Sequence, residues 1–399
     1  MGSEAGPGAA LAWLVDRSHL MAPEDLPGLA DEAARLAGAA GARLWLISRD
    51  QATLFLLPLG ADEGPATLGL EGTLAGRAYR MTEVLTGTTG GARLWVPLLD
   101  GAERLGVLEL RADHPTDLDG LRGPALSLAG LLAELVVSRS QYTDAYERVR
   151  RGTPMGVAAE LLWRQLPPTT FATRRFALSA QLEPWHEVGG DAFDYSLQGD
   201  VLHLAVFDGM GHGLSATLLA SVALAAYRNA RRSELELTST AAVVDRVLAE
   251  QFGTESFVTG VLGRLDLTTG TLSLLCAAHP APLLIRDGRP VGEANVDPGF
   301  PLGFGERDDR MLTTQLQPGD RLLLFSDGVV EARSADGVFF GLDRLLDLLT
   351  REESLGQPPP ETLRRLIRDV LEHQQGSLQD DATVLLLEWA GDVAAALVP

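Results

Sequence analysis

The stretch VLHLAVFDGMGHG, residues 201–213, decides the fold of the C-terminal half of the chain. Val201–Phe207 is short and mostly apolar, which predicts a buried β-strand. Asp208 and Gly209 end this strand, and the apolar spacing of Leu214–Ala230 predicts a helix. The stretch therefore predicts a strand, a turn that carries a carboxylate, and a helix packed on the sheet.

Three further acidic clusters border apolar strands in the same half of the chain. Any one of them alone is typical of an ordinary turn. Because all of the clusters lie at strand ends, their carboxylates can converge at one end of a pair of sheets, where they cannot all stay ionised without a cation. The pattern thus predicts a metal site formed by EVGGD (187–191), FDGMGHG (207–213), SDG (326–328) and QDDAT (379–383).

The expected metal ligands are oxygen atoms. Cys276 is the only cysteine and no histidine pair accompanies the acids, which favours Mg²⁺ or Mn²⁺ over Zn²⁺. The glycines beside the acids fit this site, since a backbone carbonyl reaches a metal only where no side chain blocks the approach. Two such ions can activate a shared water for attack on phosphorus, so the residues predict metal-assisted phosphoester hydrolysis.

The rest of this half predicts an α+β fold. Thr269-Gly270 and Asp287-Gly288 are hairpin signals between apolar strands, which imply antiparallel sheets whose outer faces are covered by helices. Strands are expected at 176–182, 201–207, 257–266, 271–278, 283–286, 321–325 and 383–389, and helices at 155–166, 214–230, 241–251, 342–350 and 360–374.

The motif order between Arg164 and Trp389 resembles the bacterial, sporulation-protein-E-like branch of the metal-dependent type 2C serine/threonine protein phosphatases. The motifs are EVGGDAFDY, VFDGMGHGLSA, LDLTTGTLSLLCAAHPAPLL, PLGFGE, LQPGDRLLLFSDGVVEARSADGVFFG and QDDATVLLLEW. The resemblance implies an antiparallel β-sandwich flanked by helix layers, with two Mn²⁺ or Mg²⁺ ions bound at one end of the sandwich.

The resemblance also implies roles for single residues. Asp191 would bridge the two ions and Asp208 would bind one of them, which makes this pair the expected catalytic residues. The full expected ligand set is Asp191, Asp208, the carbonyl of Gly209, Asp327 and Asp380. Supporting positions around the ligands are expected for Glu187, Asp194 and Asp381, of which Asp381 would orient the site.

The acid that protonates the leaving group is not assigned. Met210 fills the position where eukaryotic relatives have a histidine with that role, as is usual in the bacterial branch. His212 is a candidate, but the glycines on both sides of it indicate a tight loop that leads into a helix. His279 precedes a proline at a strand end, which favours a structural role.

Residues 1–124 predict an α+β module of the size of a sensor domain. The segments GTLAGRAYR (72–80) and LWVPLLDGAERLGVLEL (94–110) resemble a GAF domain, and Asp100-Gly101 predicts a hairpin in the second segment. The resemblance implies either a small ligand or dimerisation through this domain. No residue selects one ligand, and the two alternatives stay open.

Residues 125–166 predict a helical linker to a phosphatase domain at 167–399. Apolar residues between Leu128 and Val149 have a/d spacing, which is typical of a parallel coiled coil in a homodimer and equally of a helix packed on its own domain. Thr153 and Pro154 predict a helix start after a break at Gly152, so this joint is a predicted hinge.

The charge and hydropathy of the chain limit its partners and location. The net charge is −21, and residues 154–399 carry 19 basic and 34 acidic side chains. Such a surface repels phosphate backbones and anionic lipids, so neither nucleic acid nor a membrane is an expected partner. No apolar run of about 20 residues and no signal peptide is apparent, which together with a single cysteine predicts a cytoplasmic protein.

The resemblance implies a signalling phosphatase for phosphoserine or phosphothreonine, acting on a STAS-domain anti-sigma-factor antagonist under control of the GAF-like domain. One alternative is a non-catalytic scaffold of the same fold that binds a phosphoprotein or a sigma-factor regulator. A second is a diguanylate cyclase, because GGDAF resembles the GGDEF signature. Ala192 in place of the second acid and the downstream acidic clusters oppose the cyclase.

Overall fold

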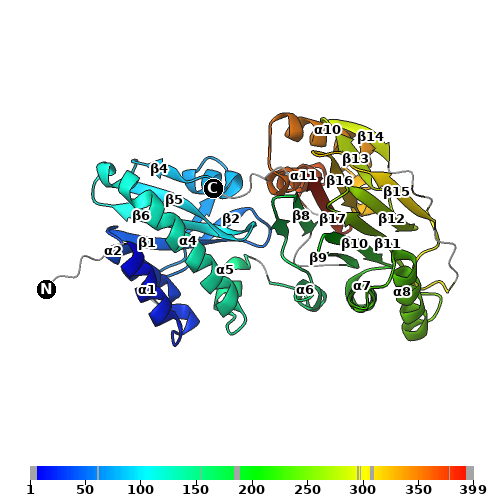
Figure 1. Ribbon diagram of the computed structural model, residues 1–399, viewed down its shortest axis with the longest axis horizontal. Coiled ribbons are helices and arrows are strands. Elements are labelled where there is room, and N and C mark those ends of the chain that lie inside the picture. Colours follow the sequence, from blue (N-terminus) through cyan, green and yellow to red (C-terminus); the bar gives the residue numbers. More distant parts are fainter. Residues whose placement is uncertain are drawn as a thin grey trace. The chain divides into compact units, whose positions relative to one another are not determined.

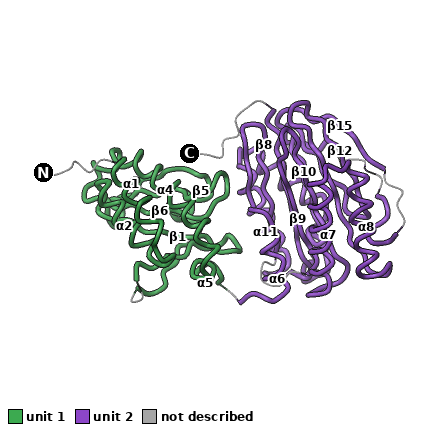
Figure 2. Tube along the Cα trace, turned by 60° about the horizontal axis from the view of Figure 1, so that its bottom comes forward, with its two compact units in different colours: residues 1–153, 396–399 green, residues 154–395 purple. Residues whose placement is uncertain are grey.

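The computed structural model describes residues 7–60, 63–152, 154–183, 189–293, 296, 298–305, 310–376 and 378–391. The chain divides into two compact units between residues 153 and 154 (Figure 2). We describe each unit by itself.

Unit 1 is a six-stranded antiparallel sheet in the order β3-β2-β1-β6-β5-β4, with helices on both faces. Alternate residues of β1 face opposite ways, so Leu44 and Leu46 join one core with α1, α2 and α4, while Trp45 and Ile47 join a second core with α3. The predicted hairpin at Asp100 is confirmed as the β5–β6 turn. The elements are α1 Pro7–Ser18, η1 Pro23–Asp25, α2 Leu26–Leu36, β1 Gly41–Ile47, β2 Thr53–Leu56, β3 Thr67–Gly69, α3 Leu74–Met81, β4 Leu85–Gly87, β5 Ala92–Asp100, β6 Glu103–Ala112, η2 Pro115–Asp117, α4 Leu118–Ser140 and α5 Ala145–Arg150.

The predicted helical linker is helical but is divided between the two units. Helices α4 and α5 belong to unit 1, and α6 (Val157–Trp163) belongs to unit 2. Leu128 and Leu135, two of the residues with a/d spacing, are buried in the core of unit 1. This packing corresponds to the alternative in which the helix lies on its own domain. Thr153, part of the predicted hinge, lies outside the described residues.

One helical segment, Pro115–Ser140, is long and apolar enough to cross a membrane by length and composition. It departs from the expectation that no segment reaches that length. Within unit 1 its buried side chains, among them Leu121 and Leu132, pack in the core that faces β5 and β6. A core helix of a folded domain meets the same criterion, so the segment is weak evidence for a membrane span.

Unit 2 is a four-layered α/β/β/α sandwich (Figure 1). One antiparallel sheet has the order β15-β12-β11-β10-β9 and is covered by α7 and α8, and the other has the order β14-β13-β16-β17-β8-β7 and is covered by α10 and α11. The predicted sandwich with outer helix layers is therefore confirmed. Its elements are β7 Thr170–Ala172, β8 Phe176–Glu183, β9 Asp191–Gln198, β10 Val201–Gly209, α7 Gly213–Arg232, α8 Leu237–Phe252, β11 Val258–Asp266, β12 Thr271–Ala277, β13 Leu283–Arg286, β14 Arg289–Glu293, β15 Met311–Gln315, β16 Arg321–Phe325, α9 Asp327–Val330, α10 Gly341–Ser354, α11 Pro359–His373 and β17 Ala382–Trp389.

Strand β16 shows why its apolar sequence fits the middle of this sandwich. Leu322 and Leu324 face the core between the two sheets, and Leu323 and Phe325 face the core beneath α10 and α11. A strand buried on both faces reads as a continuous apolar run. Such central strands bring their C-terminal ends, and the acids that follow, to one end of the sandwich.

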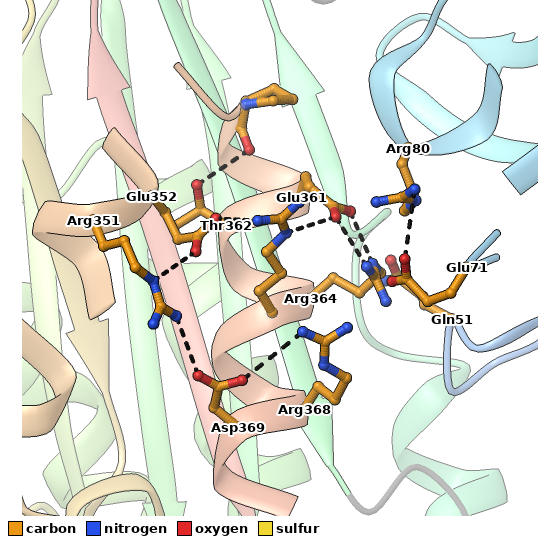
Figure 3. Close-up of polar contacts among 12 residues, drawn as sticks. Gln51, Glu71, Arg80, Arg351, Glu352, Glu361, Thr362, Arg364, Arg368 and Asp369 are labelled. Atoms are coloured by element: carbon orange, nitrogen blue, oxygen red, sulfur yellow. Dashed lines mark hydrogen bonds and ion pairs between the residues drawn. The ribbon is translucent and has the colours of Figure 1, made fainter. Parts of the chain in front are cut away.

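The outer helices of the second sheet are joined by ion pairs (Figure 3). The buried carboxylates of Glu352 and Glu361 share Arg365 at 2.9 and 3.0 Å. Arg351 reaches Asp369 at 3.4 Å. Both glutamates are almost fully buried, so these arginines satisfy charges that would otherwise be costly. The network fixes α10 against α11.

Candidate active site

Two of the predicted ligands lie opposite each other on neighbouring strands. Asp191 begins β9 and Asp208 lies near the end of β10, and the two residues are Cα partners in the antiparallel register. Directly opposed residues share one face of a sheet, with Cβ atoms about 5 Å apart. The backbones of the two segments approach each other closely here. A Cβ on Gly190 would lie 2.3 Å from the carbonyl oxygen of Gly209, so only a glycine permits this approach. The glycines thus let two carboxylate-bearing turns meet.

The second sheet contributes the other acids. Asp327 is the first residue of α9 and follows β16, while Asp380 and Asp381 precede β17, the neighbour of β16. A Cβ on Gly328 would lie 1.9 Å from the main-chain oxygen of Asp381, so only glycine fits between these loops. The acids of both loops are therefore held at the same end of this sheet.

Ser326 joins the two sheets at the site. Its hydroxyl donates to Oδ2 of Asp191 at 2.6 Å and accepts a hydrogen bond from the main-chain nitrogen of Thr383 at 3.0 Å. The Asp381 carboxylate adds a second link, since it accepts hydrogen bonds from the main-chain nitrogens of Gly189 and Asp191. Ser326 is fully buried and was not predicted from the sequence. The only feature of the sequence that points to Ser326 is its position as the first residue of the SDG motif.

The acids raise one another's pKa. Burial and then the charges of Asp208 and Asp381 hold the pKa of Asp191 well above its usual range. Burial and the charges of Asp327, Asp380 and Asp381 raise the pKa of Asp208 to about 7. Burial raises the pKa of Asp381 to about 6, and burial with Asp380 raises that of Asp327. The acids from all four turns therefore lie close enough to interact.

These residues fit divalent cations by their chemistry. The donors are carboxylates and a main-chain carbonyl, which Mg²⁺ and Mn²⁺ prefer. No described residue donates a hydrogen bond to the Asp208 carboxylate, so its oxygens are free for an ion. Within the described ranges, no three His, Cys, Asp or Glu side chains form a group that could already hold an ion.

A cavity of about 380 Å³ opens beside the acids. Asp380 and Asp381 line it, together with Gly156 and Val157 at the start of α6. His212 also lies on the wall, exposed at the start of α7, where its side chain makes no capping hydrogen bond. The cavity is large enough for a phosphorylated side chain, and it places His212 near the site without a described contact to an acid.

Asp194 has neighbours that differ from those expected of a residue supporting the ligands. It is almost fully buried and forms ion pairs with Arg228 at 2.7 Å and Arg231 at 2.8 Å, both on α7. Because side chains alternate along a strand, Asp194 faces away from the side of β9 that carries Asp191. Its contacts anchor α7 to β9. Glu187, also expected near the ligands, lies outside the described residues.

A two-sheet sandwich with outer helices and acids from both sheets at one end defines the class of type 2C phosphatase folds. Residues 198–390 match the model of the family described as Stage II sporulation protein E (SpoIIE). The match covers just under half of the chain and identifies a SpoIIE-type domain, similar to the type 2C phosphatases, in this part of it, as the motif order indicated.

Curated relatives share this half of the chain. Protein IcfG of Synechocystis sp. is 24% identical over 250 residues, which cover 55% of this chain and 39% of that protein. Phosphoserine phosphatase RsbU of Bacillus subtilis is 22% identical over 205 residues, which cover 51% of this chain and 60% of that protein. The matched region thus spans less than two thirds of either relative.

Solved structures of similar domains are also known. The SiaA-PP2C domain of Pseudomonas aeruginosa is 22% identical, with a TM-score of 0.49 over 58% of this chain and 94% of that one. The RsbU and RsbW domains of Rv1364c from Mycobacterium tuberculosis are 26% identical, with a TM-score of 0.48 over 55% of this chain and 62% of that one.

Proposed function

We propose that this protein is a metal-dependent phosphatase that removes phosphate from phosphoserine or phosphothreonine in a signalling protein. The observation that carries the proposal is the convergence of Asp191 and Asp208 from one sheet with Asp327 and Asp380 from the other. Burial and neighbouring carboxylates raise the pKa of Asp191, Asp208 and Asp327, which is the electrostatic signature of a site that a cation would complete.

In this proposal Asp191 would help to hold both of two Mn²⁺ or Mg²⁺ ions. Asp208 and the carbonyl of Gly209 would hold one ion, and Asp327 and Asp380 would hold the other. Bound ions supply Lewis acidity toward a phosphate ester and lower the pKa of water. Ser326 fixes the orientation of the Asp191 carboxylate through its 2.6 Å hydrogen bond.

Asp381 has a separate task in this proposal. Its hydrogen bonds to two main-chain nitrogens hold the loop that leads into β9. The cavity beside Asp380 receives the phosphorylated side chain. His212 lines this cavity and is the candidate proton donor to the leaving group, and a pH profile of His212→Gln tests that role.

We further propose a STAS-domain anti-sigma-factor antagonist as the substrate, in the cytoplasm, with unit 1 as a GAF-like regulatory domain that binds a small ligand or forms a homodimer. Support comes from the similarity to phosphoserine phosphatase RsbU and from the position of unit 1 before the phosphatase domain. The acidic composition of residues 154–399 favours a substrate that docks through basic or apolar side chains.

Phosphate release by the full chain tests the enzyme proposal. The substrates are p-nitrophenyl phosphate and a phosphoserine peptide, with and without Mn²⁺. We expect Mn²⁺-dependent turnover that falls at least about a hundredfold in Asp191→Asn and Asp327→Asn, because each change removes a ligand charge. Asp200→Asn, at the exposed turn between β9 and β10, is the matched control and retains turnover.

The scaffold alternative gives a different result in the same assay. A scaffold binds the phosphopeptide at saturating Mn²⁺ and releases no phosphate. That outcome would reject the enzyme and retain the fold assignment.

A further inference from the structure

His279 lies at a strained turn beneath the proposed metal site. It follows β12, and the preceding residue, Ala278, has a φ of 53°, which is unfavourable for a residue with a side chain. The turn directs the imidazole into the interior, where His279 is only 5% exposed. Cys276 donates a hydrogen bond to the main-chain oxygen of His279 at 3.1 Å, which holds the turn in place. A strained backbone conformation of this kind is retained only where the contacts around it stabilise it.

One side of the imidazole contacts the first sheet. Nδ1 of His279 lies 2.9 Å from the hydroxyl oxygen of Thr259 on β11. Thr259 is the Cα partner of Asp208 on β10, so the two side chains share one face of the sheet. His279 therefore contacts the direct cross-strand neighbour of a proposed ligand.

The other side of the imidazole faces the second sheet. Burial lowers the pKa of His279 to about 4, and the main chain of Phe325 acts in the opposite direction, which places that carbonyl near the ring. Phe325 ends β16 and directly precedes Ser326 and Asp327. Nε2 is buried, and no described residue makes a hydrogen bond of normal geometry to it. With its pKa lowered in this way, the imidazole is neutral at pH 7 and carries one N–H, and the main-chain carbonyl of Phe325 is an acceptor beside the ring.

We infer that His279 is a positioning residue for the metal ligands, which holds the Asp208 end of the first sheet against the Asp327 end of the second. A neutral imidazole suits this task because it is rigid and its two nitrogens face different neighbours. This inference rests on the proposed function only in so far as these acids bind ions. A histidine that merely fills the core would affect stability and leave ion affinity unchanged.

The test measures Mn²⁺ binding to the full chain by titration calorimetry at pH 7.5, without substrate. His279→Phe keeps the ring volume and removes both nitrogens. We expect it to weaken Mn²⁺ binding about tenfold, as outer-shell changes do at other metal sites. His279→Asn retains an amide near the Nδ1 position and is expected to recover part of the affinity through Thr259.

Thr259→Val tests the same link from its other end. It is expected to weaken Mn²⁺ binding to a similar degree, and the double variant with His279→Phe is expected to add little, because both changes remove one connection. His203→Gln is the matched control, since His203 is a partly buried histidine on β10 whose neighbours are Arg231 and Arg264 rather than the acids. It is expected to bind Mn²⁺ like the unchanged protein.

Unchanged Mn²⁺ affinity in His279→Phe, or fully additive losses in the double variant, would overturn the inference. Thermal unfolding in EDTA identifies any variant that fails to fold, and Thr259→Val then decides the question alone. An unchanged protein that binds Mn²⁺ but releases no phosphate rejects the proposed function and leaves the test of His279 valid. No Mn²⁺ binding by the unchanged protein rejects both.

Discussion

Ser326 makes a direct side-chain hydrogen bond to a proposed ligand, Asp191. Its hydroxyl donates a hydrogen bond to Asp191 of one sheet and accepts one from the main-chain nitrogen of Thr383 in the other. Ser326→Ala leaves both partners buried without this hydrogen bond, which costs about 1–3 kcal/mol of folding free energy. We also expect Mn²⁺ binding about tenfold weaker, because the Asp191 carboxylate is no longer oriented. Titration calorimetry and thermal unfolding of the variant measure the two effects separately.

Ser273→Ala is the control for this prediction. Ser273 is a strand residue of the same sandwich, and its hydroxyl contact with Thr313 is exposed to solvent. Its loss is expected to change neither Mn²⁺ binding nor stability beyond about 0.5 kcal/mol. Equal effects of both serine variants would contradict the role of Ser326.

Asp208 makes the metal-free protein sensitive to pH. Its pKa rises from the ordinary 3.8 to about 7 on folding, first through burial and then through neighbouring carboxylates. Between these values the folded state binds more protons than the unfolded state, so the free energy of unfolding falls as pH rises from about 4 to 7. In EDTA we expect a lower Tm at pH 8 than at pH 5, by roughly 3 °C or more.

Mn²⁺ reverses this trend, because protons compete with ions for the same carboxylates and ion affinity rises with pH. Asp208→Asn removes the titrating group and flattens the dependence in EDTA. Differential scanning calorimetry at pH 5, 6, 7 and 8 measures both slopes. A metal-free Tm that rises across this range in the unchanged protein would contradict the assignment.

Strand β9 shows at the level of elements what the sequence could not predict. The strands with long apolar runs, such as β10, β16 and β17, were predicted, and the helices α7 and α11 were predicted to within a few residues of their ends. Strand β9 was missed, since DAFDYSLQ contains two acids that argue against burial. Their burial depends on partners elsewhere in the chain, which periodicity does not reveal.

Asp194 is the acid of β9 whose loss is expected to affect stability most. With Asp194→Ala, Arg231 and Arg228 lose the carboxylate that pairs them, and Arg231 is itself buried. Breaking one partner of a buried ion pair costs about 3–5 kcal/mol. Denaturant unfolding measures this cost. The control is Glu236→Gln, which breaks the exposed pair with Arg264 and is expected to cost less than about 1 kcal/mol.

The glycine of α9 gives a second prediction at this scale. A Cβ on Gly328 would lie 1.9 Å from the Asp381 carbonyl oxygen, so Gly328→Ala must push the β17 loop away from β16. We expect a loss of at least about 3 kcal/mol in stability together with loss of Mn²⁺ binding. Gly130→Ala in α4 is the contrast, since nothing lies within 4 Å of its added methyl group. It is expected to stabilise the protein by about 0.5–1 kcal/mol, measured by the shift in Tm.

At the scale of the whole molecule, the segment that joins the two units can be tested for a role in regulation. Gly152 precedes the boundary, and a Cβ there would meet only Phe55, at an ordinary 3.8 Å. Gly152→Ala therefore fits the structure and mainly reduces the freedom of the chain. If unit 1 regulates the site through this joint, turnover of the full chain changes at least about twofold while Mn²⁺ affinity stays the same. Equal turnover in both proteins would argue against regulation through this segment.

The site itself was only partly open to prediction because it is assembled from distant segments. Motif order singled out Asp191, Asp208, Asp327 and Asp380, and the structure brings all of them to one end of the sandwich. The partner of Asp191, Ser326, is 135 residues away along the chain. A sequence pattern indicates which residue types lie next to a strand. The hydrogen bond that one hydroxyl makes between two sheets can be found only once the packing of the sheets is known.

The position of β17 has a consequence for how the protein is made. This strand lies between β8 and β16 in its sheet, yet it is the last described strand of the chain. During translation β8 and β16 leave the ribosome with no strand to join them, and Asp380 and Asp381 follow only just before β17. A product that stops before residue 382 exposes two unpaired strand edges, on β8 and on β16. Only a chain that includes β17 can therefore complete this sheet and hold the loop of Asp380 and Asp381 beside Asp327.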